Sequence, residues 1–519
     1  MNKTNNSGKK EIQRVLLISL PAVLEEADTY LEDGHSFHLG LAYLAGVLRT
    51  HEFAVTILDC YAEDRSNRRP DVEPGWLELG LSDEQILYHI ANADPDLVGI
   101  TVPFSCQHDL AVKLAAKIKS RFPHVVLVAG GNHITGYIDD KVLDIFDHRI
   151  LGEGEYALLE LIRSLNQDEE VGTIAGVLQR GGLQSSRVPN IRDLDQLPFP
   201  ALDLLPLEKI WGSGRRWINM IGTRGCIYRC VFCSIHTVMG HTIRRRSVEN
   251  IVAEITFWKQ KYDIQEIYFE DDNLTVHQRW AKSLFQAIAD RKFGIRLHVR
   301  NGVRADSLDE ELLKLMKAAG FQDISISPES GSQKTLTNII HKTQNLEDCL
   351  RVLKLARKLH LGVNSFFVTG FPEETWDDLE QTVQFARHLR DLGCSGFWFS
   401  LVTPFPGTEL YDSYRKSGHL PDIFDFRKLR SVDYVIQNPH YSAQDLKAFR
   451  ARVMDDLAPN TSWLIRGVRI LSLALQDPEF FWVKLQYKNP SLSKRKYPKG
   501  TGARTEPRAA SEINQPIQE

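Results

Sequence analysis

Three cysteines lie within eight residues near the middle of the chain, and their spacing suits metal binding. Cys226, Cys230 and Cys233 follow the pattern C-x3-C-x2-C. Thiolates bind zinc and the irons of iron-sulfur clusters, and three of them on one short loop can surround one metal centre. We therefore predict that these three side chains are metal ligands.

Two other interpretations of the same residues stay open on sequence alone. The spacing i, i+4, i+7 also describes one face of a helix, so the cysteines could be small core residues. Gly222 and Gly225, with Arg224 beside them, disfavour a buried helical turn. A zinc site could use His236 as a fourth ligand, but structural zinc sites usually pair two C-x-x-C knuckles across a longer gap. The sequence has no such pair.

The composition is typical of a globular protein from a reducing compartment. The 519 residues, 43% hydrophobic and 25% charged, suggest roughly two to four domains. A net charge of -4 gives no electrostatic reason to expect nucleic acid as a partner. The seven cysteines, three of them clustered, favour metal chemistry over a disulfide framework. Because no secretory signal and no apolar run of about 18 residues is visible, we expect a cytoplasmic protein without a transmembrane segment.

The first third of the chain alternates strand-like and helix-like segments. Short apolar runs are followed by segments with helical periodicity, and the unit repeats. This alternation predicts an α/β fold with an N-terminal doubly wound parallel sheet, whose ligands lie beyond the carboxyl ends of its strands. The predicted strands are Val15–Ser19, Ala54–Leu58, Leu97–Thr101, Val125–Ala129 and one that ends at Ile150, and the predicted helices are Leu39–Thr50, Asp109–Arg121 and a short one near Lys141.

Glycine-rich loops follow the fourth and fifth of these strands. Glycine allows a ligand to approach the backbone closely, and a helix N-terminus can receive polar or anionic groups. One glycine pair after a strand is most often a turn, but two such loops at successive strand ends predict a large bound cofactor. The predicted cofactor-binding residues are Gly130, Gly131, His133, Thr135, Gly152, Glu153, Gly154 and Glu155.

This segment resembles the cobalamin-binding domain that precedes many radical SAM enzymes. The resemblance covers residues 15–155 and rests on both glycine loops and on a Gly-x-x-Tyr-Leu-Ala stretch at 40–45. Many cobalamin domains carry an Asp-x-His-x-x-Gly motif that supplies a histidine to cobalt. In the corresponding loop here, after Asp33, the glycine spacing differs. The resemblance therefore implies cobalamin without a protein histidine on cobalt, with His35 and His38 as the open alternatives.

From about Trp217 to Pro406, short apolar strands again alternate with longer helices. Six β-α units in this order predict a partial barrel of parallel strands, with the functional loops at the strand C-termini. The cysteine loop directly follows the first of these strands. The predicted strands are Trp217–Ile221, Glu266–Phe269, Arg296–Val299, Asp323–Ser327, Val363–Val368 and Gly396–Leu401; the predicted helices are Val248–Gln260, Gln278–Asp290, Asp309–Ala319, Leu346–His360, Thr375–Leu392 and, after the barrel, Ser442–Leu457 and Trp463–Leu475.

A C-x3-C-x2-C loop directly after strand one of a partial barrel resembles the radical SAM superfamily. The resemblance implies that Cys226, Cys230 and Cys233 bind three irons of a 4Fe-4S cluster. The fourth iron would hold the amino and carboxylate groups of S-adenosylmethionine. One electron from the cluster would then cleave S-adenosylmethionine to a 5′-deoxyadenosyl radical. An electron donor such as flavodoxin or ferredoxin is implied as a partner.

The same resemblance implies contacts with S-adenosylmethionine at other strand ends. Asp271 or Asp272 would hold the methionine ammonium group, and Arg300 or Arg304 would pair with the methionine carboxylate. The alternatives are a carboxylate that caps a turn and an arginine in a surface salt bridge. The remaining implied contacts are Glu329 at the ribose, Gly370 and Phe232 at adenine, and Thr403-Pro404-x-Pro406-Gly407 as the sixth-strand signature of the cobalamin-linked subgroup.

Shifts in composition divide the chain into segments. Prolines at 198 and 200 favour an extended linker between two domains. After the barrel we predict a small helical subdomain, with a substrate lid or a peripheral membrane contact as alternatives for the aromatic stretch 477–483 and the basic tail. The predicted bounds are 1–10 for a disordered N-terminus, 11–170 for the cobalamin-binding domain, 171–214 for the linker, 215–410 for the barrel, 411–489 for the helical C-terminal region and 490–519 for a disordered tail.

Three functions fit these predictions. The first is a cobalamin-dependent radical SAM methyltransferase that methylates an unactivated carbon of a small-molecule or lipid substrate. The second uses both cofactors for a rearrangement, cyclisation or oxidation without methyl transfer. The third, from another class, is a non-enzymatic iron-sulfur or zinc sensor, which the residues at the strand ends disfavour. Sequence alone identifies neither the substrate nor the oligomeric state.

Overall fold

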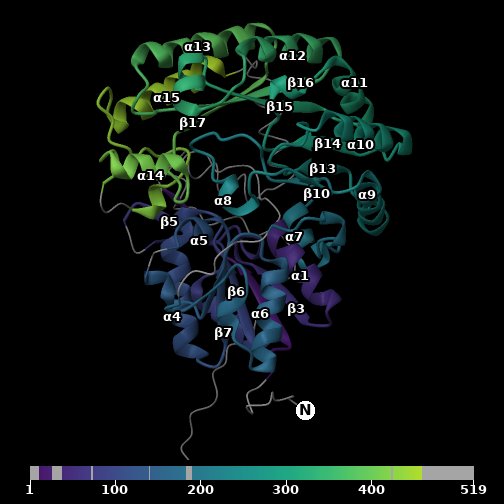
Figure 1. Ribbon diagram of the computed structural model, residues 1–519, viewed down its shortest axis with the longest axis vertical. Coiled ribbons are helices and arrows are strands. Elements are labelled where there is room, and N and C mark those ends of the chain that lie inside the picture. Colours follow the sequence, from purple (N-terminus) through teal and green to yellow (C-terminus); the bar gives the residue numbers. More distant parts are fainter. Residues whose placement is uncertain are drawn as a thin grey trace, which may run out of the picture.

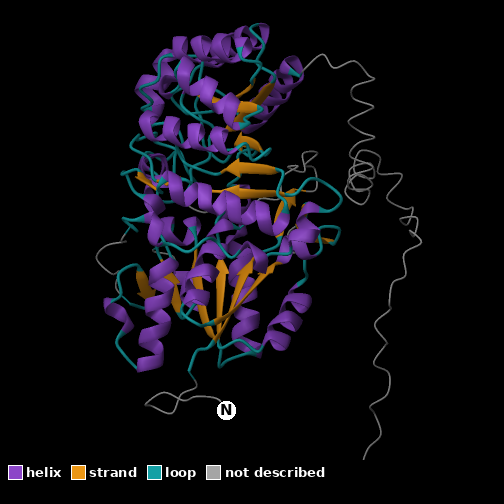
Figure 2. Cartoon of the chain, turned by 90° about the vertical axis from the view of Figure 1, so that its right-hand side faces the viewer, coloured by secondary structure: helices purple, strands orange, loops and turns teal. Residues whose placement is uncertain are grey.

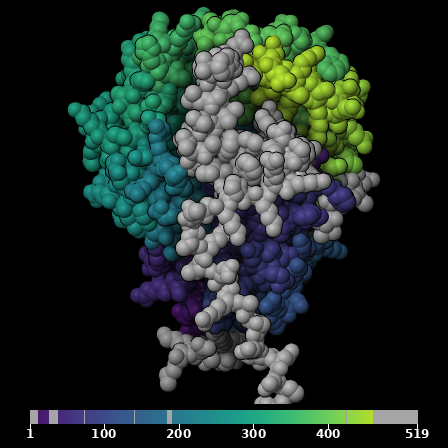
Figure 3. Space-filling model, turned by 180° about the vertical axis from the view of Figure 1, so that it is seen from behind, coloured from purple at the N-terminus to yellow at the C-terminus, as the bar shows by residue number. Residues whose placement is uncertain are grey.

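The computed structural model describes residues 11–25, 38–71, 74–138, 141–182, 190–421 and 425–458. Two α/β bodies are stacked on each other, the first built from the N-terminal third and the second from the rest (Figure 1). The parallel strands of the first sheet end on the side that faces the second body (Figure 2). Seen from behind, the teal and green second body lies above the purple and blue first one (Figure 3). The loops after the first sheet's strands therefore face the second body.

The first body is a doubly wound sheet, as predicted. Its elements are β1 Arg14–Ser19, β3 Ala54–Asp59, β6 Leu97–Thr101, β7 Val126–Gly130, β8 His148–Ile150, β9 Val177–Gln179, α1 Leu39–Thr50, α3 Asp83–Ala93, α4 His108–Arg121 and α6 Glu155–Gln167. The strand order is β3-β1-β6-β7-β8-β9, and only the last pair is antiparallel. Helices α1 and α6 share one hydrophobic core, and α3 and α4 share the other. Both sheet faces are therefore covered, which explains the continuous apolar runs of the strands.

The structure adds elements that the sequence analysis did not predict. A small antiparallel sheet contains β2 (Ala22–Glu25), β5 (Trp76–Leu79) and β4 (Arg68–Pro70). Helix α3 begins with a capping box between Ser82 and Gln85. The strands of the small sheet are short, and β2 pairs with β5 from a distant part of the chain, so no local periodicity marks them.

The predicted linker is packed against the first body for much of its length. Strand β9 lies inside it and pairs with β8, so the first sheet continues past residue 170. Further on, the carbonyl oxygen of Phe199 lies 2.9 Å from the position that a side chain at Gly46 of α1 would occupy. Leu194 and Leu202 are buried in the same core, and helix α7 (Leu207–Trp211) leads to the barrel. Its apolar residues, rather than its prolines, therefore decide the structure of this segment.

The second body is the predicted open barrel. Its strands are β10 Trp217–Met220, β13 Glu266–Phe269, β14 Arg296–Val299, β15 Asp323–Glu329, β16 Gly362–Thr369 and β17 Gly396–Leu401, and its helices are α9 Val248–Tyr262, α10 Gln278–Arg291, α11 Glu310–Ala319, α12 Leu346–Lys358 and α13 Trp376–Asp391. Neighbouring strands are parallel, and single bridges, Leu297 to Phe321 and Val303 to Ile326, join β14 to the segment of β15. The strands thus follow one another in chain order, with their carboxyl ends at one mouth.

Helix α15 (Ala443–Leu457) packs against α13 and β17, so the described part of the C-terminal region is helical and lies on the barrel. None of the described helices is long and apolar enough to cross a membrane. The predicted segments 1–10, 463–475, 477–483 and 490–519 lie outside the described residues. The connecting elements are α2 Cys60–Glu63, α5 Asn132–Gly136, β11 Thr223–Arg224, α8 Ile235–Met239, β12 Arg244–Arg245, α14 Glu409–Lys416, the π-helix η7 Thr335–Ile340 and the 3-10 turns η1 Ser105–Gln107, η2 Lys141–Ile145, η3 Val171–Thr173, η4 Leu194–Gln196, η5 Leu202–Leu204, η6 Ala305–Ser307 and η8 Phe426–Lys428.

Candidate active site

The three cysteines lie on an irregular loop at the mouth of the barrel. The loop follows β10 and the short strand β11, and only turns separate the cysteines. All three are free and partly exposed. Gly225 has a φ of +90°, and a side chain there would strike the carbonyl oxygens of Thr242 and Met239. Glycine is therefore needed for the loop to turn, and the helical interpretation of the cysteine spacing is wrong.

The thiols are near enough to influence one another. Burial raises the pKa of Cys233 to about 12, and the neighbouring Cys230 and Cys226 add to that rise. Within the described ranges, no three His, Cys, Asp or Glu side chains converge as the ligands of one metal ion do. His236 stacks on His241 instead, with 4.0 Å between ring centroids. In a 4Fe-4S cluster each thiolate binds a different iron, so the ligands stand farther apart than around one zinc ion. Three thiolates on one loop suit the cysteine ligation of an iron-sulfur cluster.

Two carboxylates follow β13 and hold the backbone before the cysteines. Asp271 is fully buried and accepts hydrogen bonds from the Gly222 amide and from both the amide and the hydroxyl of Thr223. Asp272 accepts a hydrogen bond of 2.9 Å from the Gly225 amide, and burial raises the pKa of Asp272 to about 6. A carboxylate has about four acceptor positions, so Asp272 keeps capacity for a ligand amine, whereas Asp271 fixes the turn. Of the two predicted candidates, Asp272 accepts fewer hydrogen bonds from the protein.

The two candidate arginines differ in the groups that they contact. Arg304 is buried, and its guanidinium binds Asp306 through two nitrogens, at 3.0 and 2.6 Å. Its third nitrogen, Nη1, is buried without a hydrogen-bond partner among the described residues. Burial raises the pKa of Cys230, and the positive charge of Arg304 opposes that rise. Arg300 instead lies 3.6 Å from Glu270, away from this set. Arg304 therefore offers an unused donor beside the cysteine loop.

Glu329 ends β15 in a strained conformation, with a φ of +68°. Lys342 binds its carboxylate at 3.1 Å and also donates to the Ser327 carbonyl. The π-helix η7 brings Lys342 to this position, and its last residue, Ile340, accepts the amide of Val231 from the cysteine loop at 3.2 Å. The sequence analysis did not identify Lys342, because only the fold places it beside Glu329 and Cys230.

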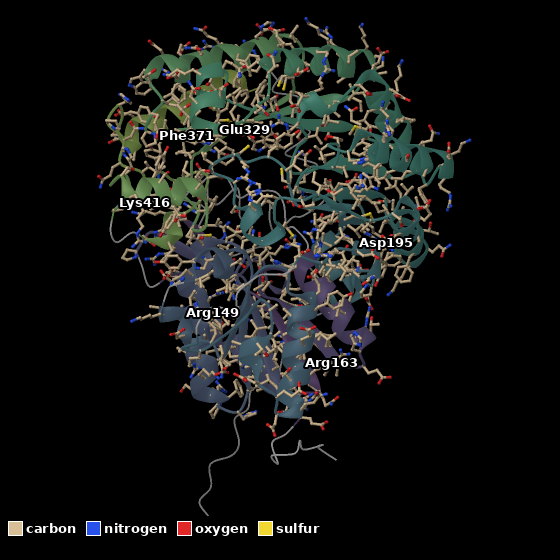
Figure 4. All side chains as sticks on the ribbon, in the orientation of Figure 1. Arg149, Arg163, Asp195, Glu329, Phe371 and Lys416 are labelled. Atoms are coloured by element: carbon tan, nitrogen blue, oxygen red, sulfur yellow. The ribbon has the colours of Figure 1, made fainter. Side chains whose placement is uncertain are left out.

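The loop after β16 carries the predicted adenine contacts. Gly370 has a φ of +106°, and the rings of Phe232 and Phe371 lie 6.2 Å apart between centroids. Figure 4 shows Phe371 and Glu329 in the upper half of the molecule, within the barrel. The hydroxyl of Tyr434 donates to the Gly370 carbonyl, and that of Tyr441 to the Phe371 carbonyl. The C-terminal region therefore holds this loop, which the sequence did not predict.

The two glycine loops of the first body are adjacent. The Thr135 hydroxyl donates to the Gly131 carbonyl and accepts the Gly152 amide, both at 3.0 Å. Gly131 has a φ of +114° and Gly152 a φ of +73°. On the loop after the neighbouring strand β6, the Phe104 side chain is 59% exposed. An exposed ring and glycine backbone at one sheet edge suit a broad, largely apolar ligand such as the corrin ring of cobalamin.

His133 and His38 of the first body already have partners. His133 is buried, with Nε2 lying 2.9 Å from Nδ1 of His108 and Nδ1 lying 2.9 Å from the Ser105 hydroxyl. Burial lowers the pKa of His133 to about 3, so the ring is neutral. His38 lies 3.9 Å from Asp59, and His35 lies outside the described residues. His133 therefore belongs to a packed cluster beneath the sheet edge.

Glu153 and Glu155 are bound to arginines of the barrel. Arg224, directly before Gly225, lies 2.6 Å from each carboxylate, and Arg244 also pairs with Glu153. All four charged side chains are buried. The sequence analysis predicted cofactor contacts for both glutamates, whereas the structure shows them engaged across the domain boundary. No local signal identifies these pairs, because the partners are far apart in the sequence.

The fold and the site define an α/β enzyme in which the cysteine loop of the barrel lies against a separate cofactor-binding domain. A family model described as the radical SAM superfamily matches residues 220–386, and one described as the B12 binding domain matches residues 29–162. The chain is 31% identical over 413 residues to an uncharacterized methyltransferase of Pyrococcus horikoshii, covering 79% of this chain and 84% of that protein. It is 31% identical over 442 residues to the cytidylyl-2-hydroxyethylphosphonate methyltransferase of Streptomyces wedmorensis, covering 77% and 81%.

A solved structure supports the same fold. OxsB, a cobalamin-dependent S-adenosylmethionine radical enzyme with aqua-cobalamin and S-adenosylmethionine bound, matches with a TM-score of 0.68 at 18% identity, covering 92% of this chain and 71% of that one. The protein belongs to the cobalamin-binding radical SAM enzymes. Its cofactors are a 4Fe-4S cluster, S-adenosylmethionine and cobalamin.

Proposed function

We propose that this enzyme transfers a methyl group to an unactivated carbon of a small-molecule or lipid substrate. When bound, the cluster and S-adenosylmethionine supply radical chemistry, and cobalamin supplies a methyl group for transfer. The two methyltransferases at 31% identity support the proposal. The observation that carries it is the junction of the cysteine loop with the glycine loops through Arg224. Radical and methyl group must meet at one carbon, which requires both cofactors at one boundary.

In this proposal each strand end holds one part of S-adenosylmethionine beside the three cysteines. Asp272 accepts hydrogen bonds from the methionine ammonium group, and Nη1 of Arg304 donates to the methionine carboxylate. Glu329, kept in place by its lysine partner, accepts the ribose hydroxyls. Gly370 and Phe232 flank the adenine, while Leu446 and Tyr434 occupy the space where a side chain at Gly370 would lie. These contacts would orient the sulfonium toward the cluster before reduction.

The inner face of the barrel is a suitable place for the substrate. Because side chains alternate along a strand, Phe366 and Trp398 project inward on β16 and β17, 5.4 Å apart between ring centroids. Trp398 is 50% exposed. Tyr268 and His298 stack at 4.5 Å, and Arg300 lies over the tyrosine ring. These polar groups already have protein partners, because the Tyr268 hydroxyl donates to Glu266, His298 lies 3.5 Å from Asp323 and Arg300 lies 3.6 Å from Glu270. The face therefore offers a substrate aromatic rings beside paired charges.

Anaerobic reconstitution tests the proposal. The full-length protein is loaded with iron, sulfide and cobalamin, reduced, and supplied with methyl-labelled S-adenosylmethionine and a fractionated extract of small molecules. We expect label on a carbon of one product, with both 5′-deoxyadenosine and S-adenosylhomocysteine formed. Deoxyadenosine without label transfer would favour the non-methylating reaction. If neither deoxyadenosine nor S-adenosylhomocysteine were formed, both proposed reactions would be contradicted. The Cys226→Ala protein serves as the inactive control.

A further inference from the structure

We infer that Glu153, Glu155, Arg224 and Arg244 position the cysteine loop and Asp272 against the cobalamin-binding domain. We call these four residues the interdomain network. The glutamates lie at the turn from β8 into α6, and the arginines lie on β11 and β12. The inference deepens the proposed function and rests on the roles proposed there for the cysteines and Asp272.

Glu153 is the centre of the interdomain network. Its side chain has no exposed surface, and it accepts hydrogen bonds from Arg224 and Arg244. The Ile191 amide at 2.9 Å and the Asn190 side chain at 3.2 Å complete its surroundings. Four donors satisfy the acceptor positions of one carboxylate. Removing one partner would leave a buried charge without compensation, so all members must be in place together.

Arg224 binds two carboxylates at once. Nη1 lies 2.6 Å from Glu153, and Nη2 lies 2.6 Å from Glu155. The guanidinium also lies 5.1 Å from the ring centre of Tyr43, a buried residue of α1. One side chain of the barrel thus fixes the orientation of α1 and α6 relative to the cysteine loop. A planar guanidinium presents its two Nη groups in a fixed geometry, which the compact point charge of a lysine ammonium does not reproduce.

The interdomain network extends to the proposed S-adenosylmethionine site through a short path. Arg224 is followed by Gly225, whose amide donates to Asp272, and then by Cys226. Burial raises the pKa of Asp272, the charges of Arg224 and Arg244 oppose that rise, and Glu153 adds to it. Glu153 of the cobalamin-binding domain and two arginines of the barrel therefore act together on the carboxylate that would hold the methionine ammonium group.

Charge removal without a change of shape tests the inference. Glu153→Gln and Glu155→Gln each delete one negative charge of the interdomain network. Glu160→Gln, on the exposed side of the same helix, is the matched control. Each full-length protein is reconstituted anaerobically. Iron content, cobalamin binding by absorbance, S-adenosylmethionine affinity, and the EPR spectrum of the reduced cluster with and without S-adenosylmethionine are then measured.

We expect the Glu153 and Glu155 variants to retain iron and cobalamin but to bind S-adenosylmethionine about tenfold more weakly, since positional coupling of this kind has that magnitude. The change in the EPR spectrum on adding S-adenosylmethionine should shrink in parallel. Glu160→Gln should match the wild type. Arg224→Lys keeps the positive charge but loses the fixed planar geometry, so the affinity of this protein for S-adenosylmethionine should fall between those of the wild type and Arg224→Gln.

Two outcomes would overturn the inference. One is unchanged S-adenosylmethionine affinity and unchanged spectra in both glutamine variants. The other is a parallel loss of iron, cobalamin and thermal stability in both glutamine variants and in Arg224→Lys, because this would show a role in folding alone. None of these measurements requires methyl transfer. Failure of the interdomain network and failure of the proposed function therefore give different results.

Discussion

Cys226, Cys230 and Cys233 lie where the thiol is favoured over the thiolate. Burial raises the pKa of all three, and that of Cys233 reaches about 12. A metal must displace these protons, and the thiolates become stable when iron supplies positive charge. Because the side chains are partly exposed and only Cys230 packs against the hydrophobic core, their contribution to folding should be small.

Replacing any one of these cysteines by alanine should abolish formation of 5′-deoxyadenosine and sharply reduce bound iron. Two remaining thiolates cannot hold three irons of the cluster. Thermal unfolding should stay close to that of the wild type. Iron analysis and chromatographic detection of deoxyadenosine check the prediction, with Cys106→Ala in the first domain as the control. Normal deoxyadenosine formation in any of the three variants would contradict the ligand assignment.

The types and spacing of the residues predict the cysteine loop but not the interdomain network. Thiol chemistry and spacing are local, so the cysteines can be identified within one short stretch. Glu153 reads locally as part of a glycine loop, and its arginine partners lie in another domain. Lys342 likewise reaches Glu329 only because a π-helix turns the chain back. Side chains that act through tertiary pairing carry no signal at this scale.

The loop between β16 and α13 is built around a buried carboxylate. The amides of Gly370 and Phe371 donate to Oε2 of Glu374 at 2.7 and 3.0 Å. Its other oxygen, Oε1, is buried without a partner among the described residues. Burial raises the pKa of Glu374 from 4.5 to about 8. The folded protein therefore binds a proton here that the unfolded chain releases above about pH 4.5, so stability falls as the pH rises toward 8.

Glu374→Gln mimics the protonated form and should stabilise the protein at pH 8.5 by about 1–3 kcal/mol, while the gain should vanish at pH 4.5. Urea unfolding of both proteins at the two pH values measures the difference. Glu380→Gln on exposed α13 surface is the control and should show no such pH dependence. An equal effect of Glu374→Gln at both pH values would refute the assignment of a raised pKa.

Periodicity predicts the barrel elements well and the connections poorly. Strands β13, β14 and β17 begin and end where the apolar runs predict, because each must bury one face beneath helices. The pairing of β2 with β5 and the packed linker follow instead from contacts between distant segments. Short strands and turns of this kind depend on their neighbours rather than on their own sequence.

Residues 425–436 run from the barrel back onto the first body, and we call this segment the C-terminal return. Phe426 stacks on His108 with 4.4 Å between ring centroids. Arg430 lies over the ring of Trp76 at 4.7 Å. Turn η8 accordingly contacts both η1 and α4. The first body is thus held from two sides, by the interdomain network and by the C-terminal return.

Phe426→Ala should release the C-terminal return from the first body. Loss of the ring removes its stacking and buried area, with an expected cost of about 1–3 kcal/mol. Hydrogen exchange should become faster in α4 and η1 but not in the barrel helices α10 and α11. Lys428→Ala, an exposed position on the same turn, should leave exchange unchanged. If hydrogen exchange in α4 of the Phe426→Ala protein stayed at the wild-type rate, other contacts would hold the C-terminal return in place.

The C-terminal return bears on the order of events during synthesis. The first sheet is complete once β9 has left the ribosome, and N-terminal domains generally fold first. The His108 side chain, however, contacts Phe426 only after the entire barrel has been synthesised, because Phe426 follows the barrel in the sequence. A nascent chain therefore presents a folded first domain whose upper edge is still uncovered.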